Sequence, residues 1–275
     1  MKKYFILSFL LIVQNLSAQS LALKTTEDSL FLFRERSLLE ENDSIKLIWN
    51  KKFTALLQQT LAQTVSLTYS FDTLKSIAVL VPSDKSFRIF NWELSFSDNS
   101  IGYYGLIQSS SKKKNQVQVV ELKDNSAQIK KPESATLDAS NWYGAHYYKL
   151  IETQKKKKKY YTLLGANWSN VLIRKKIIDV VSIGPDGKIK FGDAIFQNNK
   201  QSFKRVLFHY AAEISMSLRY DENKQMILFD HLVPREPQLK GQYEFYGPDM
   251  SIDGYTFSKG KWTLKEDIDA RNEKK

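Results

Sequence analysis

The chain has no cysteine among its 275 residues, and it has only 11 glycines and three histidines. The lack of cysteine excludes disulfides, thiol nucleophiles and thiolate sites for zinc or iron–sulfur clusters. The sequence also contains no phosphate-binding glycine loop, no dinucleotide fingerprint and no Gly-x-Ser-x-Gly elbow. It therefore offers no catalytic residues, and it favours a protein that is not an enzyme.

Long apolar runs are also absent. The run from Tyr4 to Val13 follows Lys2 and Lys3 and precedes the small residue Ala18. It is far shorter than the ~20 apolar residues that span a bilayer, but this order of basic, apolar and small residues is typical of a cleavable signal peptide. The pattern predicts an exported protein that is periplasmic, outer-membrane-associated or secreted, with no transmembrane segment in the mature chain. A buried first helix is the alternative.

Acidic residues are too few to balance the basic ones: 41 Lys and Arg face 30 Asp and Glu, a net charge of +11. The excess lies in three runs, at 112–114, 155–159 and 174–176. In an exported protein we expect no nucleic acid partner, whereas an envelope polymer, an anionic lipid or another envelope protein would suit such a surface. We favour a simpler interpretation, in which lysines at hairpin tips keep a β protein soluble and protect strand edges.

Helical spacing of apolar residues is confined to the first quarter of the chain. Asp28 is expected to cap a short helix to Leu39, and Asp43 or Ser44 a longer one to about residue 65. From residue 76, short β-like runs alternate with turn residues, as at 184–187 and 221–224, which predicts antiparallel hairpins. The expected strands lie at 77–81, 87–94, 101–108, 116–122, 143–153, 160–164, 177–183, 188–191, 205–210, 214–220, 225–230, 241–246, 255–258 and 261–264.

These patterns predict a mainly β fold with one or two N-terminal α-helices packed on it. The strands would form antiparallel hairpins or a meander, in a sandwich- or barrel-like arrangement. The predicted segments are a signal peptide over 1–18, a helical segment over 19–75, a β-rich domain over 76–265 and a charged tail over 266–275. An internal boundary in the 124–140 loop is left open.

Aromatic residues suggest a binding surface. Trp142, Tyr147 and Tyr148 lie within one segment, 141–148, and Trp168 lies in a loop rich in small and amide residues. Residues that alternate along a strand can present a row of rings on one face, which could stack on sugars or anchor a peptide. Packing inside the sheet is the commoner role of such residues, and Trp168 could equally plug the core.

Acidic residues near the C-terminus suggest a metal site. Asp249, Ser251 and Asp253 precede Gly254 as in the first half of a calcium loop, but Gly260 stands where the bidentate acid belongs. An Asp-Gly turn explains the same residues, so calcium is left open and no other cofactor is predicted.

The histidines suggest an alternative to a binding function, namely hydrolysis. His209 lies inside an apolar strand and is expected to be packed, and none of the three histidines has a spacing that suggests a metal site. His231 follows Asp230, although neighbours on a strand face opposite ways. Asp230, Asp249 and Asp253 near His231 could serve a hydrolase acting on an envelope polymer. A purely structural envelope component, docking through an edge strand, is the third hypothesis.

Five motifs stand out between residues 76 and 265: Trp142-Tyr143-Gly144-Ala145-x-Tyr147-Tyr148, Tyr161-Thr162-Leu163-Leu164-Gly165, Lys175-Lys176-Ile177-Ile178-Asp179-Val180, Phe229-Asp230-His231-Leu232-x-Pro234 and Tyr246-Gly247-Pro248-Asp249. Together they resemble a family of exported bacterial envelope proteins with no known activity. The resemblance implies an envelope location and transfers no functional residue. In that family the Leu-Leu-Gly step often continues into a Trp-Asp-Gly-Asn-like loop, whereas this chain has Ala166-Asn167-Trp168-Ser169-Asn170. We therefore expect a non-enzymatic envelope binding or assembly protein.

Overall fold

The computed structural model describes residues 2–111, 116–198 and 201–269, and their side chains from residue 21 onward except that of residue 111. Contacts divide the chain into two compact units. The first unit comprises Met1–Ile77 and Ser110–Val119, and the second comprises Ala78–Ser109 and Val120–Lys275. The basic run at 112–114 lies outside the described residues.

The first unit is built on two helices, α1 (Lys2–Leu39) and α2 (Asp43–Leu61), followed by a 3-10 turn, η1 (Thr64–Thr68). Asn42 caps α2, because its side-chain oxygen accepts hydrogen bonds from the amides of Ser44 and Ile45 at 3.0 and 3.2 Å. The predicted caps at Asp43 and Ser44 were thus one or two residues late. The predicted cap at Asp28 was wrong, because α1 runs through this residue. No helix in the described part of the chain has the length and hydropathy needed to cross a membrane.

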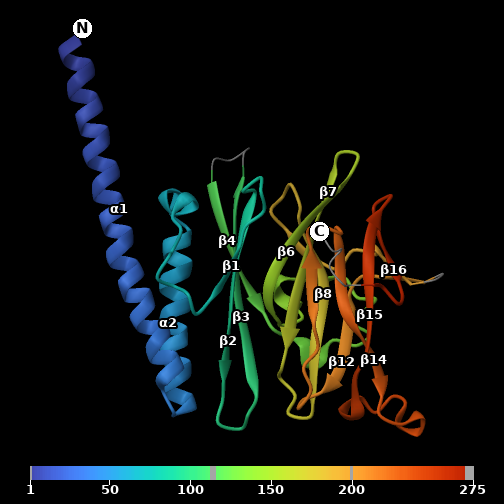
Figure 1. Ribbon diagram of the computed structural model, residues 1–275. Coiled ribbons are helices and arrows are strands. Elements are labelled where there is room, and N and C mark those ends of the chain that lie inside the picture. The colour runs from blue at the N-terminus through green and yellow to red at the C-terminus, as the bar shows by residue number, and fades with distance from the viewer. Residues whose placement is uncertain (1, 112–115, 199–200, 270–275) are drawn as a thin grey trace. The chain divides into compact units, whose positions relative to one another are not determined.

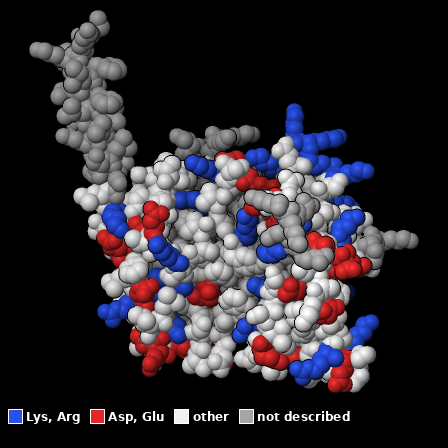
Figure 2. Space-filling model, viewed as in Figure 1, with Lys and Arg blue, Asp and Glu red and all other residues white. Residues whose placement is uncertain are grey.

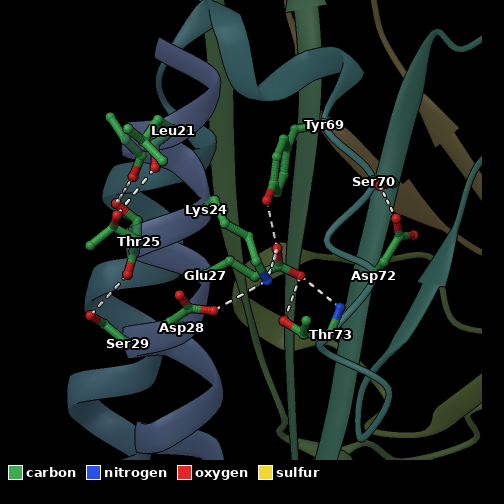
Figure 3. A network of polar contacts seen from close by, with 12 residues as sticks. Leu21, Lys24, Thr25, Glu27, Asp28, Ser29, Tyr69, Ser70, Asp72 and Thr73 are labelled. Carbon is green, nitrogen blue, oxygen red and sulfur yellow. Dashed lines mark hydrogen bonds and ion pairs between the residues drawn. The ribbon is translucent and has the colours of Figure 1, made fainter. Parts of the chain in front are cut away.

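A buried carboxylate joins α1 to the segment after η1 (Figure 3). Glu27 is only 2 % exposed, and its Oε1 accepts hydrogen bonds from the backbone amide and the hydroxyl of Thr73 at 2.7 and 2.6 Å. Its Oε2 accepts a hydrogen bond from the Tyr69 hydroxyl at 2.6 Å. Burial acts to raise the pKa of Glu27, but these hydrogen bonds outweigh burial and leave the pKa below the ordinary value for glutamate.

The depressed pKa predicts acid sensitivity in the first unit. The charged form of Glu27 is favoured by folding, so its contribution is present above the unfolded pKa of about 4.3 and is lost as the pH falls through the folded pKa. We expect Glu27→Gln to lower the free energy of opening that protects α1 amides from hydrogen exchange, by ~1.5–3 kcal/mol at pH 7. We also expect this protection to depend less on pH in the variant than in the wild type. Hydrogen exchange across pH 3–7 measures both effects. Asp28→Asn, at an exposed side chain, is the control, and an unchanged profile in Glu27→Gln would contradict the prediction.

Three sheets follow the helices in the chain (Figure 1), and their residues belong to the second unit except for 110–111 and 116–119. The first has the order β1-β2-β3-β4, the middle one β5-β9-β8-β7-β6 with β12 paired to β8, and the third β11-β10-β16-β15-β14-β13. Apart from the parallel pair β10–β16, the pairings described are antiparallel. The strands are β1 (Ala78–Leu80), β2 (Phe87–Ser95), β3 (Ile101–Ser111), β4 (Gln116–Lys123), β5 (Leu137–Asp138), β6 (His146–Lys155), β7 (Lys158–Asn167), β8 (Ile173–Ile183), β9 (Ile189–Phe191), β10 (Phe196–Asn198), β11 (Gln201–Phe203), β12 (Val206–Ala211), β13 (Leu218–Asp221), β14 (Met226–Pro234), β15 (Tyr246–Ser258) and β16 (Lys261–Lys265).

The middle sheet carries a hydrophobic core on each face. On β7, Leu163 belongs to a cluster shared with the first sheet, and the next residue, Leu164, belongs to a cluster shared with the third. On β8, Ile177 and Ile178 divide in the same way. Because successive side chains on a strand point to opposite faces, a strand buried on both sides has no polar alternation. The sheets are therefore stacked layers, as in the predicted sandwich-like arrangement.

The predicted fold class is confirmed: the protein is mainly β, with two N-terminal helices. Both predicted turns also form, with Gly187 donating its amide to the carbonyl of Gly184 at 2.9 Å and Asp221 accepting from two following amides. The strand predicted over 241–246 was wrong, because residues 243–245 form a 3-10 turn and β15 begins only at Tyr246. Three short strands, β5, β10 and β11, were not predicted.

Candidate functional site

The four aromatic residues predicted to bind lie in different environments. Trp142 and Tyr147 are fully buried, and the indole Nε1 of Trp142 donates a hydrogen bond to the Tyr147 hydroxyl at 3.2 Å. Tyr148 is 37 % exposed, and its hydroxyl donates to the carbonyl of Leu218 at 2.8 Å. Trp168 is half-buried in the loop after β7. The expected exposed row of rings is therefore not formed by Trp142 and Tyr147, which pack in the core between the first and middle sheets.

Trp168 instead lines an open hollow of about 570 Å³. Three segments of the second unit meet there: the β2–β3 turn, the β7–β8 loop with the start of β8, and the end of β12. The hollow presents an indole, two amide side chains, one guanidinium and small apolar groups. We call it the Trp168 hollow, and its lining residues are Asn99, Ile101, Trp168, Asn170, Val171, Arg174 and Ala212.

The loop that carries Trp168 is fixed by local hydrogen bonds. Asn167 is buried, its side-chain amide donates to the carbonyl of Gly144 at 2.6 Å, and its oxygen accepts from the amide and hydroxyl of Ser169. The backbone amide of Trp168 donates to the Tyr103 hydroxyl at 2.6 Å. Such short side chains that bond neighbouring backbone groups define a loop without helix or strand pairing. The backbone that carries the indole is therefore held by these bonds.

The polar groups of the hollow are also positioned by the fold. Arg174 lies opposite Tyr210 in the β8–β12 register. Burial raises the pKa of the Tyr210 hydroxyl, while a hydrogen bond from Trp168 and the charge of Arg174 oppose this rise. Asn170 uses its oxygen to accept from the amides of Leu172 and Ile173, both at 2.9 Å. The side-chain amide nitrogen of Asn170 can then donate to a ligand.

Sequence reasoning identified Trp168 but missed its neighbours. Arg174 was assigned to a basic run, although the structure places the 174–176 run within strand β8. Asn99 lies in a turn about 70 residues earlier in the chain, with a positive φ of 64° that suits asparagine. The available signal was the apolar pair Val171 and Leu172 directly after a polar loop, which the structure shows to be 60 and 63 % exposed, because exposed apolar side chains suggest a contact surface.

The acidic residues near the C-terminus separate into different contacts. Asp230 accepts from the backbone amide of Ser217, and Asp249 accepts from the amide and hydroxyl of Ser251 at 3.0 and 2.7 Å. Asp253 is buried and contacts His231. Among the described residues there is no group of three or more His, Asp or Glu side chains arranged to hold a metal ion. Calcium at Asp249, Ser251 and Asp253 stays a prediction.

The three histidines have separate partners. His146 Nδ1 lies 2.5 Å from Glu93 Oε2, and His209 stacks on Tyr243 with ring centroids 4.7 Å apart. Burial lowers the pKa of His209 to about 4, so this residue is neutral at pH 7. His231 lies beside Asp253, the one pairing that brings together residues of the predicted acidic site.

The basic run at 155–159 lies at a hairpin tip, as expected. Figure 2 shows lysine side chains gathered over this end of the β6–β7 hairpin, whose turn is formed by Lys156 and Lys157. The flanking Lys158 and Lys159 form ion pairs with Asp193 and Asp84 at 2.8 and 2.6 Å.

The composition of the Trp168 hollow, rather than a known relative, carries the functional argument. No family model, no curated protein and no solved structure matches this chain.

Proposed function

We propose that the protein is a non-enzymatic binding protein of the cell envelope, and that it takes a saccharide of an envelope polymer in the Trp168 hollow. The observation that carries the proposal is the half-buried indole of Trp168, which stands on a hydrogen-bonded loop at an open hollow. The envelope location rests on the signal peptide predicted over residues 1–18 and on the family resemblance.

The groups around the hollow suit a sugar ring. The flat apolar face of an indole can stack on the C–H groups of a pyranose, and a tryptophan needs little loss of conformational freedom to do so. Asn99 and Asn170 supply amides of the kind that hydrogen-bond hydroxyl groups, and Arg174 supplies a fork that matches a carboxylate. An open, mixed apolar and polar surface suits an exposed chain of sugars better than an acyl chain, which needs an enclosed apolar pocket.

The proposal predicts a large effect of Trp168→Ala on saccharide affinity. Loss of a tryptophan anchor typically costs ~2 kcal/mol or more, so we expect the Kd to rise at least tenfold. Isothermal titration with neutral and uronic-acid oligosaccharides measures this effect, with Tyr243→Ala, at an aromatic side chain 40 % exposed elsewhere in the unit, as the matched control.

Arg174→Met should affect the binding of acidic and neutral saccharides differently. We expect this variant to lose affinity for uronic-acid oligosaccharides and to keep its affinity for neutral ones, because only a carboxylate pairs with the guanidinium. If no oligosaccharide binds, or if Tyr243→Ala and Trp168→Ala weaken binding equally, the Trp168 hollow is not a saccharide site.

A further inference from the structure

A second hollow opens where strand β14 ends. It has a volume of about 280 Å³ and is formed by three segments of the second unit. These are the turn after β12, the end of β14 with the residue that follows it, and the stretch from the 3-10 turn at 243–245 into the start of β15. We call it the Arg235 pocket, and the side chains that line it include Glu213, Ile214, Val233, Arg235, Glu244 and Phe245.

The backbone around the Arg235 pocket is held by hydrogen bonds of the protein itself. Arg235 follows the last residue of β14, and its amide donates to the carbonyl of Phe245 at 2.9 Å. In the turn after β12, the amide of Ile214 donates to the carbonyl of Ala211 at 3.1 Å. The side chain of Ile214 also packs against the core cluster shared by the middle and third sheets. These contacts hold the segments that carry the charged side chains of the pocket.

Three charged side chains of both signs line the pocket. Glu213 and Arg235 are exposed, and Glu244 is half-buried. In the described part of the chain, none of these three side chains forms an ion pair or a hydrogen bond with another residue. A ligand that pairs with them therefore displaces no internal partner. The guanidinium of Arg235 matches a carboxylate, and the two glutamates match an ammonium group.

Apolar side chains supply the other part of the surface that a ligand would contact. Ile214 and Val233 are half-buried, and the large ring of Phe245 is 40 % exposed. Exposed apolar groups with polar groups around them are typical of ligand-binding surfaces. The volume lies at the small end of the range for ligand pockets, ~300–1,000 Å³, so the pocket suits a ligand of one or two amino acid residues rather than a long chain.

We propose that the Arg235 pocket binds a zwitterionic amino acid or dipeptide with apolar side chains. Arg235 pairs with the carboxylate of the ligand, Glu213 and Glu244 pair with its ammonium group, and its side chains lie against the apolar lining. The ligand is bound and released without any covalent step, in keeping with a binding protein. None of the described residues lines both this pocket and the Trp168 hollow, so the two proposals are independent.

The first test is an NMR titration of the ¹⁵N-labelled protein with leucine and with leucyl-leucine. We expect one or both to shift the amide signals of Arg235 and Gly247 and to leave those of Trp168 and Asn170 unchanged. N-acetylation or C-amidation of the ligand should raise the Kd about five- to tenfold, because each removes one charge-assisted contact at a solvent-exposed site. Glycylglycine should bind at least about tenfold more weakly than leucyl-leucine, because it has no apolar side chain to bury.

Variants of the pocket assign each end of the ligand to its partner. Arg235→Met should raise the Kd of the free ligand about five- to tenfold and abolish the difference between the free and the C-amidated forms. Glu213→Gln combined with Glu244→Gln should do the same for the free and the N-acetylated forms. Lys240→Met and Glu236→Gln are the matched controls, since these exposed charges lie in the same stretch of chain but do not line the pocket, and each should keep the wild-type Kd.

Several results would overturn the proposal. These are no shift of the pocket amides with either leucine or leucyl-leucine, equal binding of free and blocked ligands, or an equal loss of affinity in the control variants. Circular dichroism of each variant shows that a lost affinity is not a lost fold. Saccharide binding is measured with other ligands and other variants, so failure here leaves the Trp168 hollow to its own test.

Discussion

Arg205→Met is expected to lower the free energy of unfolding of the second unit by about 3–5 kcal/mol, because it leaves the buried carboxylate of Asp179 without its cation. The side chains of Arg205 and Asp179 are both 0 % exposed, and Arg205 Nε lies 2.7 Å from Asp179 Oδ2. The Tyr147 hydroxyl donates to the same oxygen at 3.3 Å, and the amide of Val180 donates to Oδ1 at 2.8 Å. Urea unfolding followed by circular dichroism measures the loss.

A double variant separates the ion pair from the space it fills. Arg205→Met combined with Asp179→Leu removes both charges and leaves apolar side chains in their place, so we expect it to recover most of the stability lost by the single variant. One Arg205 nitrogen, Nη2, has no hydrogen-bond partner in the described part of the chain, so the pair is not fully satisfied. If the double variant is as unstable as Arg205→Met, the buried pair itself is required.

Trp142→Ala is expected to destabilise the second unit by about 3–5 kcal/mol, the range for removal of a fully buried large side chain. Trp142 is 0 % exposed and packs in the core shared by the first and middle sheets. The variant leaves a cavity, and it removes the indole N–H that donates a hydrogen bond to the Tyr147 hydroxyl. The midpoint of urea unfolding, compared with that of the wild type at constant m value, gives the change.

Trp168→Ala is the matched control for this prediction. Trp168 is half-buried beside an open hollow, so water can fill the space and we expect a smaller loss of stability. The two substitutions should thus have different effects: Trp142→Ala lowers the stability of the fold, and Trp168→Ala lowers saccharide affinity. A Trp142→Ala variant with wild-type stability would show that this residue is not a core residue.

Features that depend on neighbouring residues could be predicted from local sequence patterns. The helix over α2, the turn at 184–187 and most strands follow from local spacing and turn chemistry, because each is stabilised by contacts a few residues apart. Boundaries were less certain where a side chain outside the element decides them, as Asn42 does for α2. The position of Trp168 in a loop was also predictable, because amide and small residues surround it.

Which residues lie together in one site depends on the packing of the sheets and could not be predicted from local patterns. Asp179 and Arg205 are 26 residues apart, and His231 and Asp253 are 22 apart, so sheet register rather than local spacing joins each pair. Asn99 and Arg174 are likewise distant in sequence, and the fold brings both to the Trp168 hollow. The middle sheet is covered on both faces, which removes the polar alternation that would reveal the orientation of its side chains. The sequence therefore left both binding and packing open for Trp142 and Tyr147, and the layers of the fold make them core residues.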